Sequence, residues 1–339
     1  MPRDFAALAV AAMTLSTVIS ACTPATSPTR SAPPAAVLTA AEQRSLARVE
    51  RDLVNVDYFT SQEVDVVAEA KAELEYRCLR NAGIDWRPPG PSDIPDTPNP
   101  LNAIRPPDLW LHQDGPIGLA TPLAEPGTLD TFLSSLRSAD SAMQEYPPAP
   151  PGWEDAEFGN PRREITIDIG GGGSVTVPVS GCAGQVVEQL YGVDAAAYHR
   201  TRTAAIVASK VLDQVVGNES VADATRRWST CMHRQGYRVA TPDDLYELFQ
   251  SDFEGLINGT RTIADLSETD AAVGAADAEC KTQSGLATTF ARTLIDVGEE
   301  RLRRNEGVLA AYAKYREEGL ERAAAIVGGS FPDDVDGGS

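Results

Sequence analysis

The stretch of sequence that decides the fold is Trp228-Ser229-Thr230-Cys231-Met232-His233-Arg234-Gln235-Gly236-Tyr237. Trp228 and Cys231 are three residues apart, so they share one face of a helix. Gly236 is the expected end of that helix, because a residue without a Cβ readily adopts the left-handed conformation that closes helices. The stretch therefore predicts a helix whose tryptophan and cysteine face the protein interior.

An earlier segment repeats the pattern of Cys, then Leu or Met, three residues, Gly and an apolar residue: Glu75-Tyr76-Arg77-Cys78-Leu79-Arg80-Asn81-Ala82-Gly83-Ile84. One further cysteine follows each copy, Cys182 after the first and Cys280 after the second. Four cysteines allow three connectivities, and the repeat favours Cys78–Cys182 and Cys231–Cys280. The alternative is a four-cysteine zinc site. Zinc sites usually contain close Cys-x-x-Cys pairs, and this chain has none.

Residues 1–21 are interpreted as a lipoprotein signal peptide. The apolar run at residues 5–19 is shorter than the roughly 20 residues that span a membrane. It ends in Ile19-Ser20-Ala21-Cys22, which resembles the bacterial lipobox. That resemblance implies cleavage before Cys22 and lipid attachment to its sulfur. The alternative is an ordinary signal peptide with a chance cysteine. We therefore expect a protein held by lipid on the extracytoplasmic face of the cell membrane.

The rest of the chain is divided by composition and by helix signals. Residues 22–38 are rich in Pro, Ser, Thr and Ala, which predicts a disordered tether. Residues 39–217 form a first predicted disulfide unit and residues 218–327 a second, which ends in a long helix. The helix with Cys280 is expected to start at Ser267 and continue to about Val327. Residues 328–339 are expected to be a disordered acidic tail.

Two segments of the first unit differ from its helices. Fifteen of the 24 prolines lie within residues 86–151. Prolines at this density argue against helix, so we expect a long irregular loop with one helical piece near residues 128–143, pinned to the body by Trp110 and Trp153. Residues 164–179 alternate apolar and polar side chains on both sides of four glycines, which predicts a β-hairpin. The predicted fold class is mainly α: a helical domain with one β-hairpin, a long Pro-rich loop and two disulfides.

The net charge of −20 limits the possible partners. An acidic surface repels phosphate backbones, so we expect no nucleic-acid binding. It favours a monomer whose unknown envelope protein or ligand partner is cationic. The other partner is the membrane, reached through the lipid on Cys22.

Candidate chemistry is sparse. Cys231 and His233 are two residues apart and point to different faces of a helix, so they form no metal or nucleophile pair. Glu154, Asp155 and Glu157 lie beside Trp153 and are interpreted as solvated loop acids. We assign no catalytic, cofactor-binding or metal-ligating residue and expect no cofactor.

Several motifs together resemble a known group of proteins. They are the lipobox, the tether, the Cys-Met-x-x-x-Gly-Tyr helix, and the hairpin that leads into Gly181-Cys182 and Leu190-Tyr191-Gly192. This combination resembles uncharacterised actinobacterial cell-envelope lipoproteins, over roughly residues 39–315. The resemblance implies no activity. We therefore expect a non-enzymatic binding or interaction role in the envelope. The alternative is an envelope hydrolase that acts on glycan or peptide through loop carboxylates or acids near Asp243 and Asp244.

Overall fold

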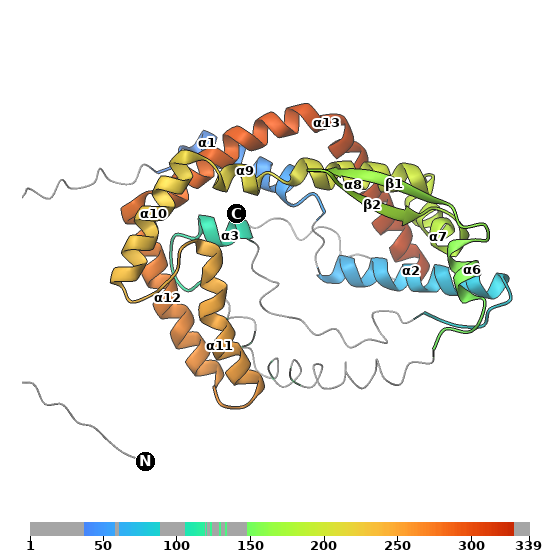
Figure 1. The fold of residues 1–339 in the computed structure, drawn as a ribbon, viewed down its shortest axis with the longest axis horizontal. Coiled ribbons are helices and arrows are strands. Elements are labelled where there is room, and N and C mark those ends of the chain that lie inside the picture. The colour runs from blue at the N-terminus through green and yellow to red at the C-terminus, as the bar shows by residue number, and fades with distance from the viewer. Residues whose placement is uncertain are drawn as a thin grey trace, which may run out of the picture. The chain divides into compact units, whose positions relative to one another are not determined.

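A computed structural model describes residues 37–57, 61–88, 106–118, 120, 123, 129, 133 and 148–328 (Figure 1). As the sequence predicts, the fold is mainly α with one antiparallel hairpin and two disulfides. The elements, in chain order, are α1 (Ala40–Val49), the π-helix η1 (Glu50–Val54), α2 (Ser61–Asn81), α3 (Pro106–Leu111), α6 (Trp153–Phe158), β1 (Glu164–Gly170), β2 (Gly173–Pro178), α7 (Gly181–Tyr191), α8 (Ala195–Ser209), α9 (Leu212–Val216), α10 (Glu219–Arg234), the 3-10 helix η3 (Pro242–Asp244), α11 (Leu245–Ile257), α12 (Ile263–Ser284) and α13 (Leu286–Val327).

Side chains that cap the first turn start several of these helices. In α1 the Thr39 hydroxyl accepts from the Glu42 N–H at 3.2 Å, and the Glu42 carboxylate accepts from the Thr39 N–H at 2.6 Å. Asp194 caps α8 by accepting from the Ala197 N–H, and Asn218 caps α10 by accepting from the Ser220 N–H. These contacts satisfy backbone donors that have no partner inside the helix.

The prediction for the helix with Cys280 is wrong at both ends. The helix starts at Ile263 rather than Ser267, because Thr262 and Asp265 form a capping box one turn earlier. It does not continue to Val327, because Gly285 has a φ of 70° and ends α12. The chain turns there, and α13 begins as a separate helix of 42 residues.

The Pro-rich region contains a helix that the sequence did not predict, α3. The predicted helical piece near residues 128–143 lies almost wholly outside the described residues. The prolines of α3, Pro106 and Pro107, lie in the first turn, where a helix loses no hydrogen bond by lacking their N–H groups. Trp110 pins α3 as predicted. Its ring stacks on Phe290 with centroids 5.1 Å apart, and its Nε1 donates to Asp243 at 2.9 Å.

The predicted hairpin is confirmed. Ile165 pairs with Val177 and Ile167 with Val175 in an antiparallel register. Glycines at the turn have positive φ angles, which side chains with a Cβ rarely adopt.

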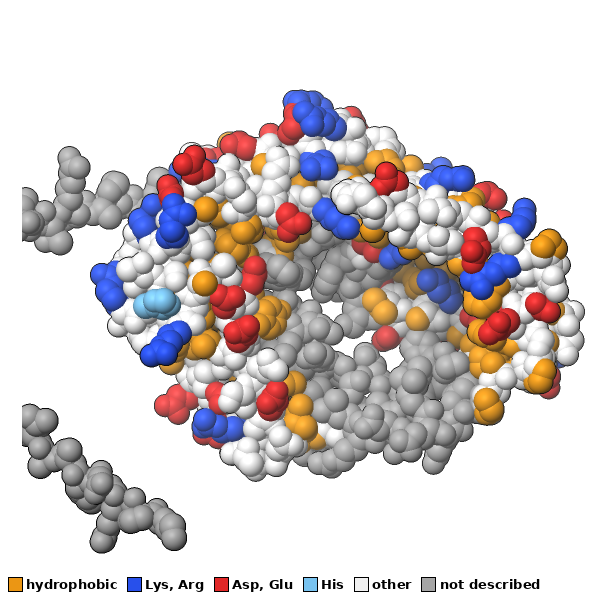
Figure 2. All heavy atoms as spheres, viewed as in Figure 1, with side chains coloured by type: hydrophobic (Ala, Val, Ile, Leu, Met, Phe, Trp, Pro, Cys, Tyr) orange, Lys and Arg blue, Asp and Glu red, His pale blue; other side chains and the backbone are white. Residues whose placement is uncertain are grey.

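Helix α13 is the element that most others contact: α1 and α10 pack against it, and so do α2, α7 and α8 (Figure 1). Near its C-terminal part it approaches α7 closely, because a Cβ at Gly319 would lie 2.6 Å from the Tyr191 ring. One hydrophobic cluster contains residues of both cysteine units, among them Leu190 and Phe290. Figure 2 shows acidic and basic side chains spread over the visible face, with several basic ones and a histidine over α10.

Both predicted disulfides are confirmed. Cys78–Cys182 joins α2 to α7, with Cα atoms 5.6 Å apart. Cys231–Cys280 joins α10 to α12, with Cα atoms 5.5 Å apart. In a chain-entropy description, closed loops of about 105 and 50 residues contribute at most roughly 5 and 4 kcal/mol to stability.

Candidate functional site

The predicted lipid-attachment residue, Cys22, lies outside the described residues. The four later cysteines are all in disulfides, so none of them offers a free thiol. Within the described ranges, none of the helices has the length and apolarity needed to cross a membrane.

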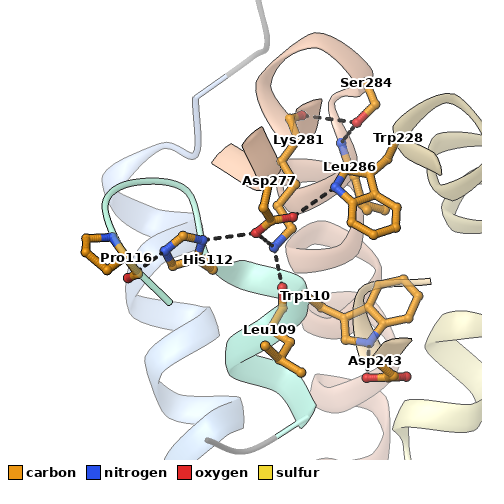
Figure 3. A network of polar contacts seen from close by, with 10 residues as sticks. All are labelled: Leu109, Trp110, His112, Pro116, Trp228, Asp243, Asp277, Lys281, Ser284 and Leu286. Atoms are coloured by element: carbon orange, nitrogen blue, oxygen red, sulfur yellow. Dashed lines mark hydrogen bonds and ion pairs between the residues drawn. The ribbon is translucent and has the colours of Figure 1, made fainter. Parts of the chain in front are cut away.

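A buried polar network centres on Asp277 of α12, whose side chain is 0% exposed (Figure 3). Its carboxylate accepts from Trp228 Nε1 at 2.9 Å, from Lys281 Nζ at 2.6 Å and from His112 Nδ1 at 3.0 Å. The Lys281 ammonium also donates to the Leu109 carbonyl at the end of α3. Burial lowers the pKa of Lys281, and the Asp277 carboxylate opposes that shift. The network therefore fastens α3 to α10 and α12 inside the protein.

His112 acts within this network rather than as a free base. Its Nε2 lies 3.2 Å from the Pro116 carbonyl, while its Nδ1 faces Asp277. A pocket of about 490 Å³ opens beside this histidine and is also lined by Asp108 and Asp114. Since both ring nitrogens are engaged, His112 presents no free nitrogen to that pocket.

A second buried carboxylate of α12 holds the next part of the same segment. Asp270 is 1% exposed and accepts from the backbone N–H groups of Gly118 and Ala120 at 3.1–3.2 Å. Between the two carboxylates, a Cβ at Gly274 would lie 2.4 Å from the Gly115 carbonyl oxygen. The face of α12 thus combines small residues, which allow close approach, with acids that bind the approaching backbone and side chains.

Sequence reasoning missed this face of α12. The signal was the spacing of Asp270, Asp277 and Lys281, at seven and four residues, on a helix otherwise rich in Ala and Gly. Such spacing places all three side chains on one side of the helix. Charged residues that share a helix face with Ala and Gly are candidates for a buried polar contact.

The interpretation of the acids beside Trp153 as solvated is wrong for Glu157, although Glu154 and Asp155 are exposed. Glu157 is 6% exposed and hydrogen-bonds Glu75 of α2. Burial, and then the charge of Glu75, raises the pKa of Glu157 to about 8. Two carboxyl groups so close in a dry site share a proton at neutral pH. Neither lines any of the three pockets described in this section.

The other acids of the hydrolase alternative, Asp243 and Asp244, also accept hydrogen bonds from the protein itself. Asp243 accepts from Trp110, and burial raises the pKa of its carboxyl group. Asp244 caps η3 by accepting from the N–H groups of Ala240 and Thr241 at 2.7 and 2.9 Å. No group of three or more His, Cys, Asp or Glu residues that could hold a metal ion occurs among the described residues.

The largest of these pockets is a groove of about 630 Å³ between α13 and the segment formed by α1 and η1. At one end the two elements touch, because a Cβ at Gly298 would lie 2.3 Å from Val49. At the other end Arg316 Nη1 donates to the Val56 carbonyl at 2.7 Å. The α13 side chains between these contacts recur every three or four residues, so they form one stripe along the groove. They are Glu299, Leu302, Arg303, Glu306, Leu309, Ala310, Ala313 and Arg316.

The groove combines an apolar floor with charged edges. Leu302, Leu309 and Val56 are each 6% exposed, whereas Ala310 and Ala313 are exposed. The stripe from residue 299 to residue 316 extends for about 25 Å at 1.5 Å per residue.

Exposed ion pairs line one edge of the groove. At the η1 side, Arg48 and Arg51 share one carboxylate, Asp52, at 3.9 and 2.7 Å. These ion pairs are exposed, so they contribute little to stability and can exchange for contacts with a ligand. We call this region, lined by α1, η1 and α13, the α13 groove.

The α13 groove has the size of a small-molecule site, since such sites measure roughly 300–1,000 Å³. Its walls come from helices joined at both ends by direct contacts, so the site is formed in advance of any ligand. Comparisons of this chain with protein-family models, with curated proteins and with solved structures found no match.

Proposed function

We propose that the protein is a lipoprotein anchored through Cys22 on the extracytoplasmic face of the cell membrane, where it binds a ligand without catalysing a reaction. The α13 groove is the observation that carries the binding role. Its floor of Leu302, Leu309 and Val56 suits the apolar part of an amphipathic ligand, and its arginines and acids suit the polar part.

The disulfides support the extracytoplasmic location, because such bonds persist in oxidising compartments and are rare in the cytosol. The lipobox supports the anchor. In this proposal the protein is one of the cell-envelope lipoproteins that its motifs resemble. Radiolabelled palmitate should be incorporated into the wild-type chain and not into the Cys22→Ala variant. Labelling of the variant would refute lipid attachment at Cys22.

The geometry favours binding over the hydrolase alternative. A glycosidase needs two carboxyl groups on opposite sides of an open cleft. Glu157 and Glu75 instead contact each other, and Glu157 is 6% exposed. Asp243 and Asp244 bond groups of the protein itself.

Ligand binding in the α13 groove can be tested with a variant whose larger side chain occupies the groove. The probe is 1-anilinonaphthalene-8-sulfonate, an apolar dye with one anionic group, measured by fluorescence titration on the full chain. Ala313→Trp places an indole in the groove from an exposed position, so the fold should persist while dye binding falls about tenfold or more. Ala325→Trp is the matched control, since Ala325 is exposed on the same helix and outside the groove. Equal dye affinity in the two variants would contradict the assignment of the ligand site.

A further inference from the structure

A second pocket, distinct from the α13 groove, lies where α10 meets the end of α12. Its volume is about 490 Å³. The α10 side chains that line it recur every three or four residues on the exposed face of the helix: Asp223, Arg226, Arg227, Thr230 and Arg234. The α12 wall is Gln283 and Ser284, and Cys231 contributes the floor. We call it the α10 pocket.

The walls of the α10 pocket are held in place by covalent and polar contacts. The Cys231–Cys280 disulfide joins the two helices directly below the opening. Arg227 donates to the Ser284 carbonyl through Nη2 at 2.9 Å and Nε at 3.3 Å. One guanidinium is therefore oriented at the pocket wall without a ligand, which lowers the entropy lost when an anion binds.

The charge of the α10 pocket is opposite to that of the chain. Three arginines against one aspartate leave a net charge of +2 in its lining, whereas the whole chain carries −20. Arg226 pairs with Asp223, and Arg227 bonds a neutral carbonyl. Arg234 is exposed and makes no hydrogen bond or ion pair with the part of the chain that the structure describes. Figure 2 shows that Lys and Arg side chains gather over α10 on this face.

We propose that the α10 pocket binds the phosphate group of a phosphate monoester or diester. Guanidinium groups bind phosphate oxygens through paired, charge-assisted hydrogen bonds. A phosphate monoester carries a charge near −2 and balances the lining, whereas a diester carries about −1 and balances half of it. The phosphate comes either from a soluble phosphorylated molecule or from a phospholipid headgroup, and the chemistry of recognition is the same.

Calorimetric titration of the full chain at about 0.1 M ionic strength, where the Debye length is about 10 Å, tests this site, with glycerol 3-phosphate and tripolyphosphate as probes. Arg234→Gln should weaken binding about threefold to tenfold, because it removes one exposed charge-assisted contact. Arg200→Gln is the control: Arg200 is exposed on α8, has no partner among the described residues and gives the same charge change. It should alter affinity by less than about twofold, since charges beyond a Debye length are screened.

Sedimentation with vesicles of phosphatidylglycerol, against vesicles of phosphatidylcholine, distinguishes the two sources. The ligand is a lipid headgroup if the chain binds phosphatidylglycerol vesicles, Arg234→Gln weakens that binding, and glycerol 3-phosphate does not bind. The ligand is a soluble phosphate ester if glycerol 3-phosphate binds, Arg234→Gln weakens that binding, and the chain does not bind vesicles. Equal effects of Arg234→Gln and Arg200→Gln, or no binding to any phosphate probe, would overturn the proposal. Circular dichroism of each variant checks that the helices are retained.

Discussion

Replacing Asp277 with asparagine tests the buried network that fastens α3 to the helical body. The substitution preserves volume and removes the negative charge that pairs with Lys281, a side chain that is 1% exposed. Breaking a buried ion pair on one side costs about 3–5 kcal/mol. The lysine can escape the full penalty by losing its proton. At pH 7 that costs an ordinary lysine about 4.6 kcal/mol, from 3.4 pH units at 1.36 kcal/mol each.

We therefore expect Asp277→Asn to lower the free energy of unfolding by about 3–5 kcal/mol at pH 7. This is a large part of the 5–15 kcal/mol that stabilises typical domains. Urea unfolding followed by circular dichroism measures the loss. Asp277→Asn combined with Lys281→Met is the matched control. It removes the unpaired cation, so it should recover most of the loss.

The pH dependence of the same variant supplies a stricter test. Burial lowers the pKa of Lys281, and in the variant the Asp277 charge no longer opposes this. The folded variant then holds the Lys281 proton less tightly than the unfolded chain, in which the lysine stays protonated below about pH 10.4. Because the unfolded state binds more protons, stability rises with pH, by up to about 2.7 kcal/mol between pH 7 and pH 9. A loss below about 1 kcal/mol at pH 7, or no recovery at pH 9, would refute the role of this ion pair.

Three further predictions concern other parts of the fold. Burial raises the pKa of Glu157 to about 8. The folded state therefore keeps a proton that the unfolded chain releases near pH 4.5, so the free energy of unfolding should fall as pH rises between these values. Glu157→Gln should flatten this slope, which is at most about 1.4 kcal/mol per pH unit, and an unchanged slope in urea titrations would contradict the assignment. Gly274→Ala should destabilise the protein because its Cβ meets a carbonyl oxygen, whereas Gly307→Ala, with nothing within 4 Å, should stabilise α13 by up to about 1 kcal/mol in thermal unfolding. Replacing both Cys231 and Cys280 with serine should cost about 4 kcal/mol at most, and a melting temperature equal to that of the wild type would refute the stabilising role of this disulfide.

Local signals in the sequence predicted much of the fold. The capping pair of Thr39 and Glu42 marks a real helix start, because a side-chain oxygen three residues before a matching acid satisfies nearby backbone donors. The glycines after β1 mark a real turn. The repeated Cys-x-x-x-x-Gly pattern predicted both disulfides, since each pair links a cysteine on a regular helix to the next cysteine along the chain.

Other features depend on neighbours that are distant in the sequence, so no local pattern could show them. Glu157 is an ordinary loop acid until α2 brings Glu75 against it and excludes water. Asp277 meets His112 across 165 residues, and the pocket between α10 and α12 exists only because two helices are crosslinked. By itself the sequence determined most of the helices, the hairpin and the cysteine pairing, because these follow from backbone geometry and spacing, but not the bounds of α12 or the presence of α3. Only the tertiary structure decided which charges are buried, shared or left facing a pocket, because the energy of a charge depends on everything that packs around it.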